Sequence, residues 1–169
     1  MVIRLGRIGI SLFIVLVIIQ PQTWAEARRT LHGLDSIILT IAPLHPDAEL
    51  GALSRSALRE ELIVNLQQVG LHILSEDDRQ PVLDYPKLNL AVHLTPLESF
   101  PVYSVFITLS LRQRACLTRN LIVCEPAVTW ESMSKVRTIS VSQLAEVRMD
   151  VHTLISQFVD DYQTENPKR

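Results

Sequence analysis

Two stretches in the second half of the chain alternate between apolar and polar residues, and they constrain the fold more than any other feature. Lys87–Thr95 places Leu88, Leu90, Val92 and Leu94 on one side. Val102–Arg112 places Tyr103, Val105, Ile107, Leu109 and Leu111 on one side. A period of two predicts strands, because successive side chains of a strand point to opposite faces. Antiparallel sheets tolerate water on one face, so the pattern predicts a sheet with an open side.

The polar sides of these two strands predict a candidate partner surface on the open face. Its residues are Asn89, His93, Ser104, Phe106, Thr108, Ser110 and Arg112. Phe106 is a large apolar side chain among polar ones, and contact with a partner explains it better than contact with bare water.

Two earlier segments predict a strand, a helix and a second strand. Leu34–Ala42 is β-branched and apolar and stops before Pro43. Ser54 can cap a helix that ends at Gly70, and the apolar residues inside it recur at helical spacing. Leu71–Leu74 follows at once as a short strand. This order predicts a parallel crossover unit.

The C-terminal part predicts further strands and one more helix. A strand follows Pro126, over Ala127–Met133, and resumes at Val136–Ile139. Ser140 to Gln143 has the form of a capping box, and apolar residues then recur at helical spacing up to Asn166-Pro167. We therefore expect an α+β fold, a two-layer α/β sandwich of order β-α-β-β-β-β-α. Its mixed, mostly antiparallel sheet of 4–5 strands carries both helices on one face.

The first 27 residues have the layout of a secretory signal. Arg4 and Arg7 precede an apolar run over 8–19, and small residues follow at Ala25 and Ala27. We expect cleavage after Ala25 or Ala27, which leaves 28–169 as a single domain and exports the chain to the periplasm or beyond. The alternative is an uncleaved anchor, although the run is shorter than the roughly 20 residues that span a bilayer.

Cys116 and Cys124 are the only cysteines of the chain, and they bracket a predicted turn at Thr118–Asn120. Export to an oxidising compartment favours a disulfide between them. The alternative is a pair of buried free thiols, because two strand cysteines bridge only when both point to one face. If the strand begins at Pro126, Cys124 lies in the loop and can adapt.

The charge balance argues against a nucleic-acid partner. Sixteen Lys and Arg residues stand against 18 Asp and Glu residues, whereas a protein held by phosphate neutralisation needs a basic excess. Five basic residues do gather near the predicted hairpin: Arg112, Arg114, Arg119, Lys135 and Arg137. With Trp130 they could form a basic platform for an anionic ligand, or Trp130 lies in the core and the cations are solvated.

No motif for catalysis, metal binding or cofactor binding is present in the sequence. The five histidines have no two-ligand helical spacing, and neither a GxSxG sequence nor a glycine-rich phosphate loop occurs. The acidic pairs Asp77-Asp78 and Asp160-Asp161 are expected to be solvated. We therefore expect no cofactor, and an enzyme would need His93 or Asp84 to meet groups from distant segments.

Several short segments resemble those of small exported bacterial proteins of uncharacterised function. They are Leu111-Arg112-Gln113, Arg119-Asn120, Thr129-Trp130, Leu66–Leu71, and the ending Phe158-x-x-Asp161-Tyr162 with Asn166-Pro167. The element order is also similar to accessory domains of envelope assembly such as the lipopolysaccharide-assembly lipoprotein. The resemblance implies an envelope location and no assigned activity.

Taken together, the sequence predicts a non-enzymatic exported module that binds a protein or an envelope component. The contact would use the open sheet face or an unpaired sheet edge. The alternative is a carrier of a small apolar ligand or lipid between helices and sheet, and the third hypothesis is a hydrolase-like enzyme.

Overall fold

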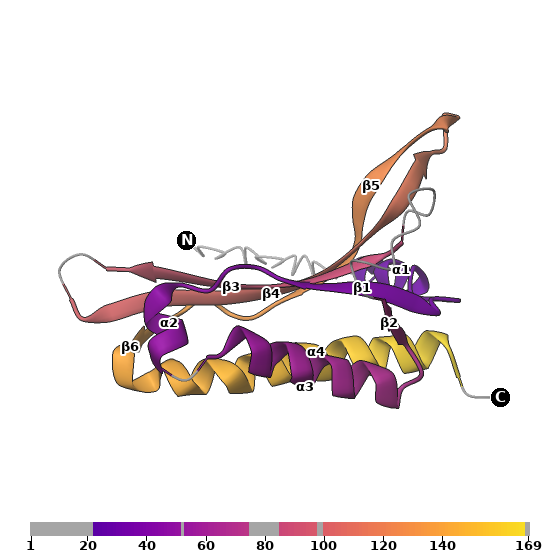
Figure 1. Ribbon diagram of the computed structural model, residues 1–169. Helices are drawn as coiled ribbons and strands as arrows, with labels where there is room; N and C mark the ends of the chain where they lie inside the picture. Colours follow the sequence, from indigo (N-terminus) through magenta and orange to yellow (C-terminus); the bar gives the residue numbers. More distant parts are fainter. Residues whose placement is uncertain (1–21, 52, 75–84, 98–99, 168–169) are drawn as a thin grey trace, which may run out of the picture.

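The computed structural model describes residues 22–51, 53–74, 85–97 and 100–167 (Figure 1). The helices are α1 (Gln22–Arg29), α2 (Pro46–Gly51), α3 (Arg55–Gln68), the 3-10 helix η2 (Val141–Glu146) and α4 (Val147–Glu165). The strands are β1 (Ser36–Ile41), β2 (His72–Leu74), β3 (Lys87–Pro96), β4 (Val102–Leu117), β5 (Asn120–Met133) and β6 (Arg137–Ser140).

The strands form one mixed sheet in the order β2-β1-β3-β4-β5. β1 runs parallel to both β2 and β3, and β4 runs antiparallel to β3, β5 and β6. β5 pairs with Thr108–Leu117 and β6 with Val102–Val105, so the two strands share the outer edge of β4. Within the described residues the sheet has six strands, one more than the upper number expected, because the chain pairs again as β6 after Met133.

α3 and α4 lie together below the sheet, which confirms the two-layer α+β sandwich (Figure 1). The helices and the inner sheet face share one hydrophobic core. Phe158 of α4, Leu62 of α3 and Leu109 of β4 are all 0% exposed in it. Burial of an apolar side chain of this size stabilises a fold by about 1.5–3 kcal/mol.

The crossover unit is confirmed with small changes of its bounds. β1, α3 and β2 follow one another, and β1 and β2 are parallel neighbours. The Ser54 side chain caps α3 by accepting a hydrogen bond from the Ala57 backbone N–H. Gly70 has φ +95° just past the helix, a conformation that only glycine adopts without strain. α2 was not expected from the sequence.

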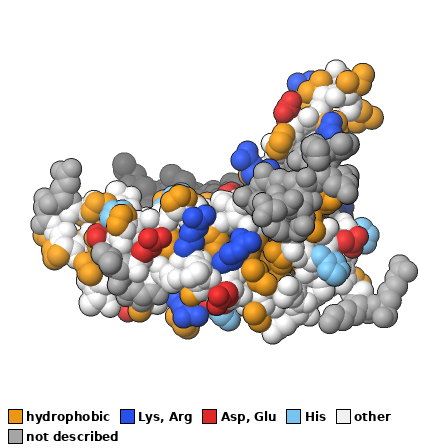
Figure 2. Space-filling view, viewed as in Figure 1, with side chains coloured by type: hydrophobic (Ala, Val, Ile, Leu, Met, Phe, Trp, Pro, Cys, Tyr) orange, Lys and Arg blue, Asp and Glu red, His pale blue; other side chains and the backbone are white. Residues whose placement is uncertain are grey.

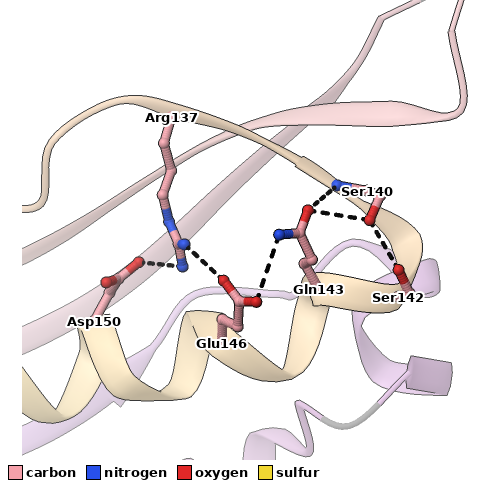
Figure 3. Close-up of polar contacts among 6 residues, drawn as sticks. All are labelled: Arg137, Ser140, Ser142, Gln143, Glu146 and Asp150. Carbon is pink, nitrogen blue, oxygen red and sulfur yellow. Dashed lines mark hydrogen bonds and ion pairs between the residues drawn. The ribbon is translucent and has the colours of Figure 1, made fainter.

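The capping box at Ser140 is also confirmed (Figure 3). The Gln143 side chain accepts a hydrogen bond from the Ser140 N–H at 3.1 Å. The helix begins as the 3-10 helix η2 and continues as α4. Its apolar stripe is buried against the sheet: Leu144, Val147, Val151, Leu154, Ile155, Phe158 and Tyr162.

The largest departure from expectation is a hairpin that extends beyond the sheet. β4 continues to Leu117 and β5 begins at Asn120, so the strand does not start after Pro126 as expected. β3 begins at Lys87, opposite Arg112, so residues 113–117 pair only with β5. We call residues 113–127 the arm, and Figure 1 shows it projecting away from the body.

Residues 1–21, which hold most of the expected signal, lie outside the described residues. α1 spans both expected cleavage points, and Leu31 just after it is 0% exposed in the core. Within the part of the chain that the structure describes, no helix combines the length and apolar character needed to cross a membrane.

Candidate functional site

The register of β3 and β4 places all seven predicted surface residues on one face of the sheet. Asn89 lies opposite Ser110, and His93 lies opposite Phe106. Directly opposed residues of antiparallel strands share a face, and Leu88 and Leu90 on the other face belong to the core. The seven residues therefore share the sheet face that points away from the core.

The seven residues differ in how much of each is open to solvent. His93 and Arg112 are exposed, and Asn89, Ser104, Phe106 and Thr108 are half-buried. Ser110 is buried, at 9% exposure. Ser110 therefore lies on the predicted face but offers little surface to a partner.

An aromatic stack lies toward the Thr95 end of this face. The rings of His93 and Phe106 lie 4.2 Å apart between centroids, with an angle of 10° between their planes. Stacking of this kind is worth about 0.5–1.5 kcal/mol beyond the buried area. The stack makes a flat apolar platform on this face.

β5 adds apolar residues to the platform that the sequence reasoning missed. Met133 lies opposite Thr108 and is 60% exposed, and Val128 lies opposite Arg112 and is 50% exposed. The bulge between Leu111 and Arg112 shifts the pairing, so the alternation of β5 alone could not have placed these residues.

One end of the open face is basic. Lys87 and Arg112 are directly opposed across β3 and β4. Together with Tyr85, Gln113 and Pro126 they line a surface hollow of about 330 Å³. Like charges in opposed positions repel each other, so a carboxylate or another anion between them would be stabilised.

At the other end of the face, β3 pairs with β4 on one side, and no described strand pairs with its other side. The last residue of β1, Ile41, lies opposite Leu90 of β3. Ala42, which follows Ile41, still donates its N–H to the Leu90 carbonyl. Val92–Thr95 therefore continue beyond β1, and with Pro43–His45 they line a hollow of about 310 Å³. An extended peptide can add to a strand edge of this kind through main-chain hydrogen bonds.

A polar cluster at the start of α2 lies beside that hollow and was not predicted. The Tyr103 hydroxyl donates a hydrogen bond to the Asp47 carboxylate, and His45 Nδ1 lies 3.6 Å from Asp47 Oδ2. The bond to the carboxylate raises the pKa of Tyr103 above its usual value, because the charged acceptor favours the protonated phenol. The hydrogen bond between Tyr103 and Asp47 joins β4 to α2, although the two residues lie 56 positions apart in the chain.

Trp130 is a core residue, so the basic platform around it does not form. It is 2% exposed, its Nε1 donates to Asp161 Oδ2 at 3.0 Å, and its ring meets Phe158 edge-on at 4.9 Å. The expectation that Asp160-Asp161 is solvated is wrong for Asp161, which also pairs with Arg28 Nε at 3.8 Å.

The five basic residues near the hairpin separate in space. Arg137 forms ion pairs with Glu146 at 3.1 Å and Asp150 at 2.7 Å, which attach β6 to η2 and α4 (Figure 3). Arg114 and Arg119 lie exposed on the arm. The residues form no single patch.

Cys116 and Cys124 form a disulfide, so the expected bridge is confirmed. They are directly opposed in β4 and β5, so Cys124 lies in a strand and not in a loop. Among the described residues, no group of three or more His, Cys, Asp or Glu side chains could hold a metal ion. Asp84, one of the two residues considered for enzymatic chemistry, lies outside the described residues.

No family model matches this chain, and no curated protein matches it. The solved structures that are similar to it include two PelC dodecamers from Paraburkholderia phytofirmans. One is 18% identical in sequence, and the matched region covers 76% of this chain and 87% of the PelC chain. The other, a leucine-to-methionine variant, is 17% identical and covers 76% and 88%. The TM-score is 0.39 for each, a level that establishes neither fold nor function.

Proposed function

We propose that this chain is an exported, non-enzymatic module of the cell envelope that binds a protein partner through the open face of its sheet. The observation that carries the proposal is the platform of apolar side chains on that face. Phe106 stacks on His93, and Met133 stands 60% exposed on the strand beyond. Exposed apolar side chains that are grouped on one face mark contact surfaces, whereas scattered ones do not.

The disulfide supports export. Cys116 and Cys124 are paired in the structure, and disulfides persist in oxidising compartments such as the bacterial periplasm. The basic and apolar layout of residues 1–27 points to the same destination.

The chemistry of the face favours a polypeptide as the partner. The unpaired stretch Val92–Thr95 offers main-chain groups to an extended segment. The platform of Phe106 and Met133 offers an apolar contact, and Lys87 with Arg112 offers a site for an acidic side chain.

The binding role is favoured over catalysis by the placement of His93. The ring of Phe106 stacks on the ring of His93, and this packing favours a contact role for the histidine.

Replacing Phe106 and Arg112 together by alanine tests the proposal. The partner that co-purifies with the chain from envelope extract should be lost, because the variant removes the platform and one cation of the face. The matched control is Val64→Ala on α3, which is 53% exposed on the opposite layer. If the double variant folds and retains every co-purifying protein, the open face is not the binding surface.

A further inference from the structure

We propose that the end of the arm is a lipid-contacting element that rests in the surface of an anionic membrane. The inference concerns a part of the molecule that is separate from the open sheet face. It rests on the shape of the arm, on the apolar residues at its end and on its charge.

Three consecutive apolar residues next to the turn at the end of the arm stand outside the strand ladder. Cys116 pairs with Cys124, but the next residue, Leu117, pairs with Asn120. Leu121–Val123 therefore have no opposed residue and form a bulge in β5. They are 72%, 90% and 41% exposed, in chain order. A bulge is a built feature that re-aims side chains, and here it presents apolar ones to the surroundings.

The end of the arm is braced by covalent and polar contacts. The disulfide closes the hairpin on one side of the bulge. The Asn120 side chain accepts a hydrogen bond from the Ile122 N–H at 3.2 Å, and Cys124 Sγ lies 3.3 Å from the Leu121 carbonyl. Backbone groups that are already satisfied cost less to remove from water. Of the backbone groups of the bulge, the Ile122 N–H is satisfied in this way by the Asn120 side chain.

The charge of the arm identifies the surface that it would meet. Arg114 and Arg119 stand on the arm against one acid, Glu125, and Arg112 lies at its base. The chain as a whole has a net charge of −2, so the arm is positive on a negative molecule. Figure 2 shows hydrophobic side chains gathered at the end of the arm, at the upper right, with Lys and Arg side chains beside them.

Apolar residues flanked by arginine suit the boundary between acyl chains and anionic headgroups. Apolar side chains enter the boundary, and each cation near an anionic surface adds about a fivefold gain in binding. The projection of the arm from the body lets its end reach such a surface without steric contact from the sheet or the helices (Figure 1). A protein surface would serve the apolar bulge equally, but it would not require the excess of arginine.

A tryptophan at the bulge reports the contact directly. The full chain with Ile122→Trp is mixed with vesicles of phosphatidylglycerol and phosphatidylcholine, and fluorescence emission and quenching by brominated lipid are recorded. The matched control is Val64→Trp on α3, 53% exposed and distant from the arm. We expect a blue shift and quenching for Ile122→Trp, and neither for Val64→Trp. Replacing Arg114 and Arg119 by serine should weaken the vesicle response about 25-fold.

The remaining outcomes overturn the proposal. No response of Ile122→Trp to anionic vesicles, or an equal response of Val64→Trp, shows that the bulge does not contact lipid. An equal response to pure phosphatidylcholine removes the role of the arginines. A blue shift that grows with protein concentration in the absence of vesicles assigns the bulge to a second copy of the chain. Thermal unfolding of each variant should match that of the parent, since the bulge lies outside the core.

Discussion

At the scale of single residues, Asp161 shows how a side chain can acquire a role that its sequence neighbourhood hides. Two adjacent acids near the end of a helix are usually solvated, and Asp160 is exposed. Asp161 instead accepts the Trp130 indole N–H and pairs with Arg28. Only the packing of α4 against β5 brings these groups together, so no local pattern could have predicted the contact.

Replacing Asp161 by alanine should lower the free energy of unfolding by about 1–3 kcal/mol, because it leaves the buried Trp130 N–H without a partner. The matched variant Asp160→Ala should change it by less than about 0.5 kcal/mol. Urea unfolding followed by tryptophan fluorescence measures both. Equal effects of the two variants would contradict the structural role of Asp161.

Tyr162 provides a prediction about pH. Burial, and next the negative charge of Asp35, raise the pKa of Tyr162 above its ordinary value of 10.0. At pH values below 10.0, Tyr162 holds its proton in both the folded and the unfolded chain. Above it the unfolded chain releases the proton first, so the free energy of unfolding falls as pH rises. Tyr162→Phe should flatten this decline in alkaline unfolding titrations, and an unchanged slope would show that Tyr162 does not contribute to it.

At the scale of elements, periodicity predicted the parts of the fold that touch the core. The stripe Leu58, Leu62 and Leu66 is buried in α3, as helical spacing requires. The hairpin turn was expected, but the length of its strands was missed because both faces of the arm are exposed and its residues follow no apolar alternation. α2 was missed because its six residues, which begin with Pro46, are too few to form a full apolar stripe. On the candidate site, the alternation located β3 and β4, while the bulge in β5 concealed Met133 and Val128.

Reduction of the Cys116–Cys124 disulfide should loosen the arm and leave the core intact. A disulfide stabilises mainly by restricting the opened chain, and this one closes a separation of 8 residues outside the core. We expect trypsin to cleave after Arg119 roughly tenfold faster or more in the reduced protein. The thermal midpoint reported by Trp130 should change little. If the core melts together with the arm, the two are one cooperative unit.

At the scale of the whole molecule, the structure relates the expected export signal to the folded domain. α1 covers Gln22–Arg29, so cleavage after Ala25 or Ala27 would remove part of it. Thr30 and Leu31 remain in both cases. The Thr30 hydroxyl donates a hydrogen bond to the Thr129 carbonyl, and Leu31 is buried in the core. Intact-mass measurement of the exported protein should find Glu26 or Arg28 as the first residue. A first residue within 1–21 would mean that the signal is retained.

The central claim is that the open sheet face binds a protein partner, and photocrosslinking from that face tests it most directly. A photoreactive amino acid replaces Phe106, beside the exposed Met133, and the matched control replaces Val64 on α3. After irradiation of intact cells, the account predicts one discrete protein adduct from position 106 and none from position 64. No adduct from position 106 at normal expression, or the same adduct from both positions, would contradict it.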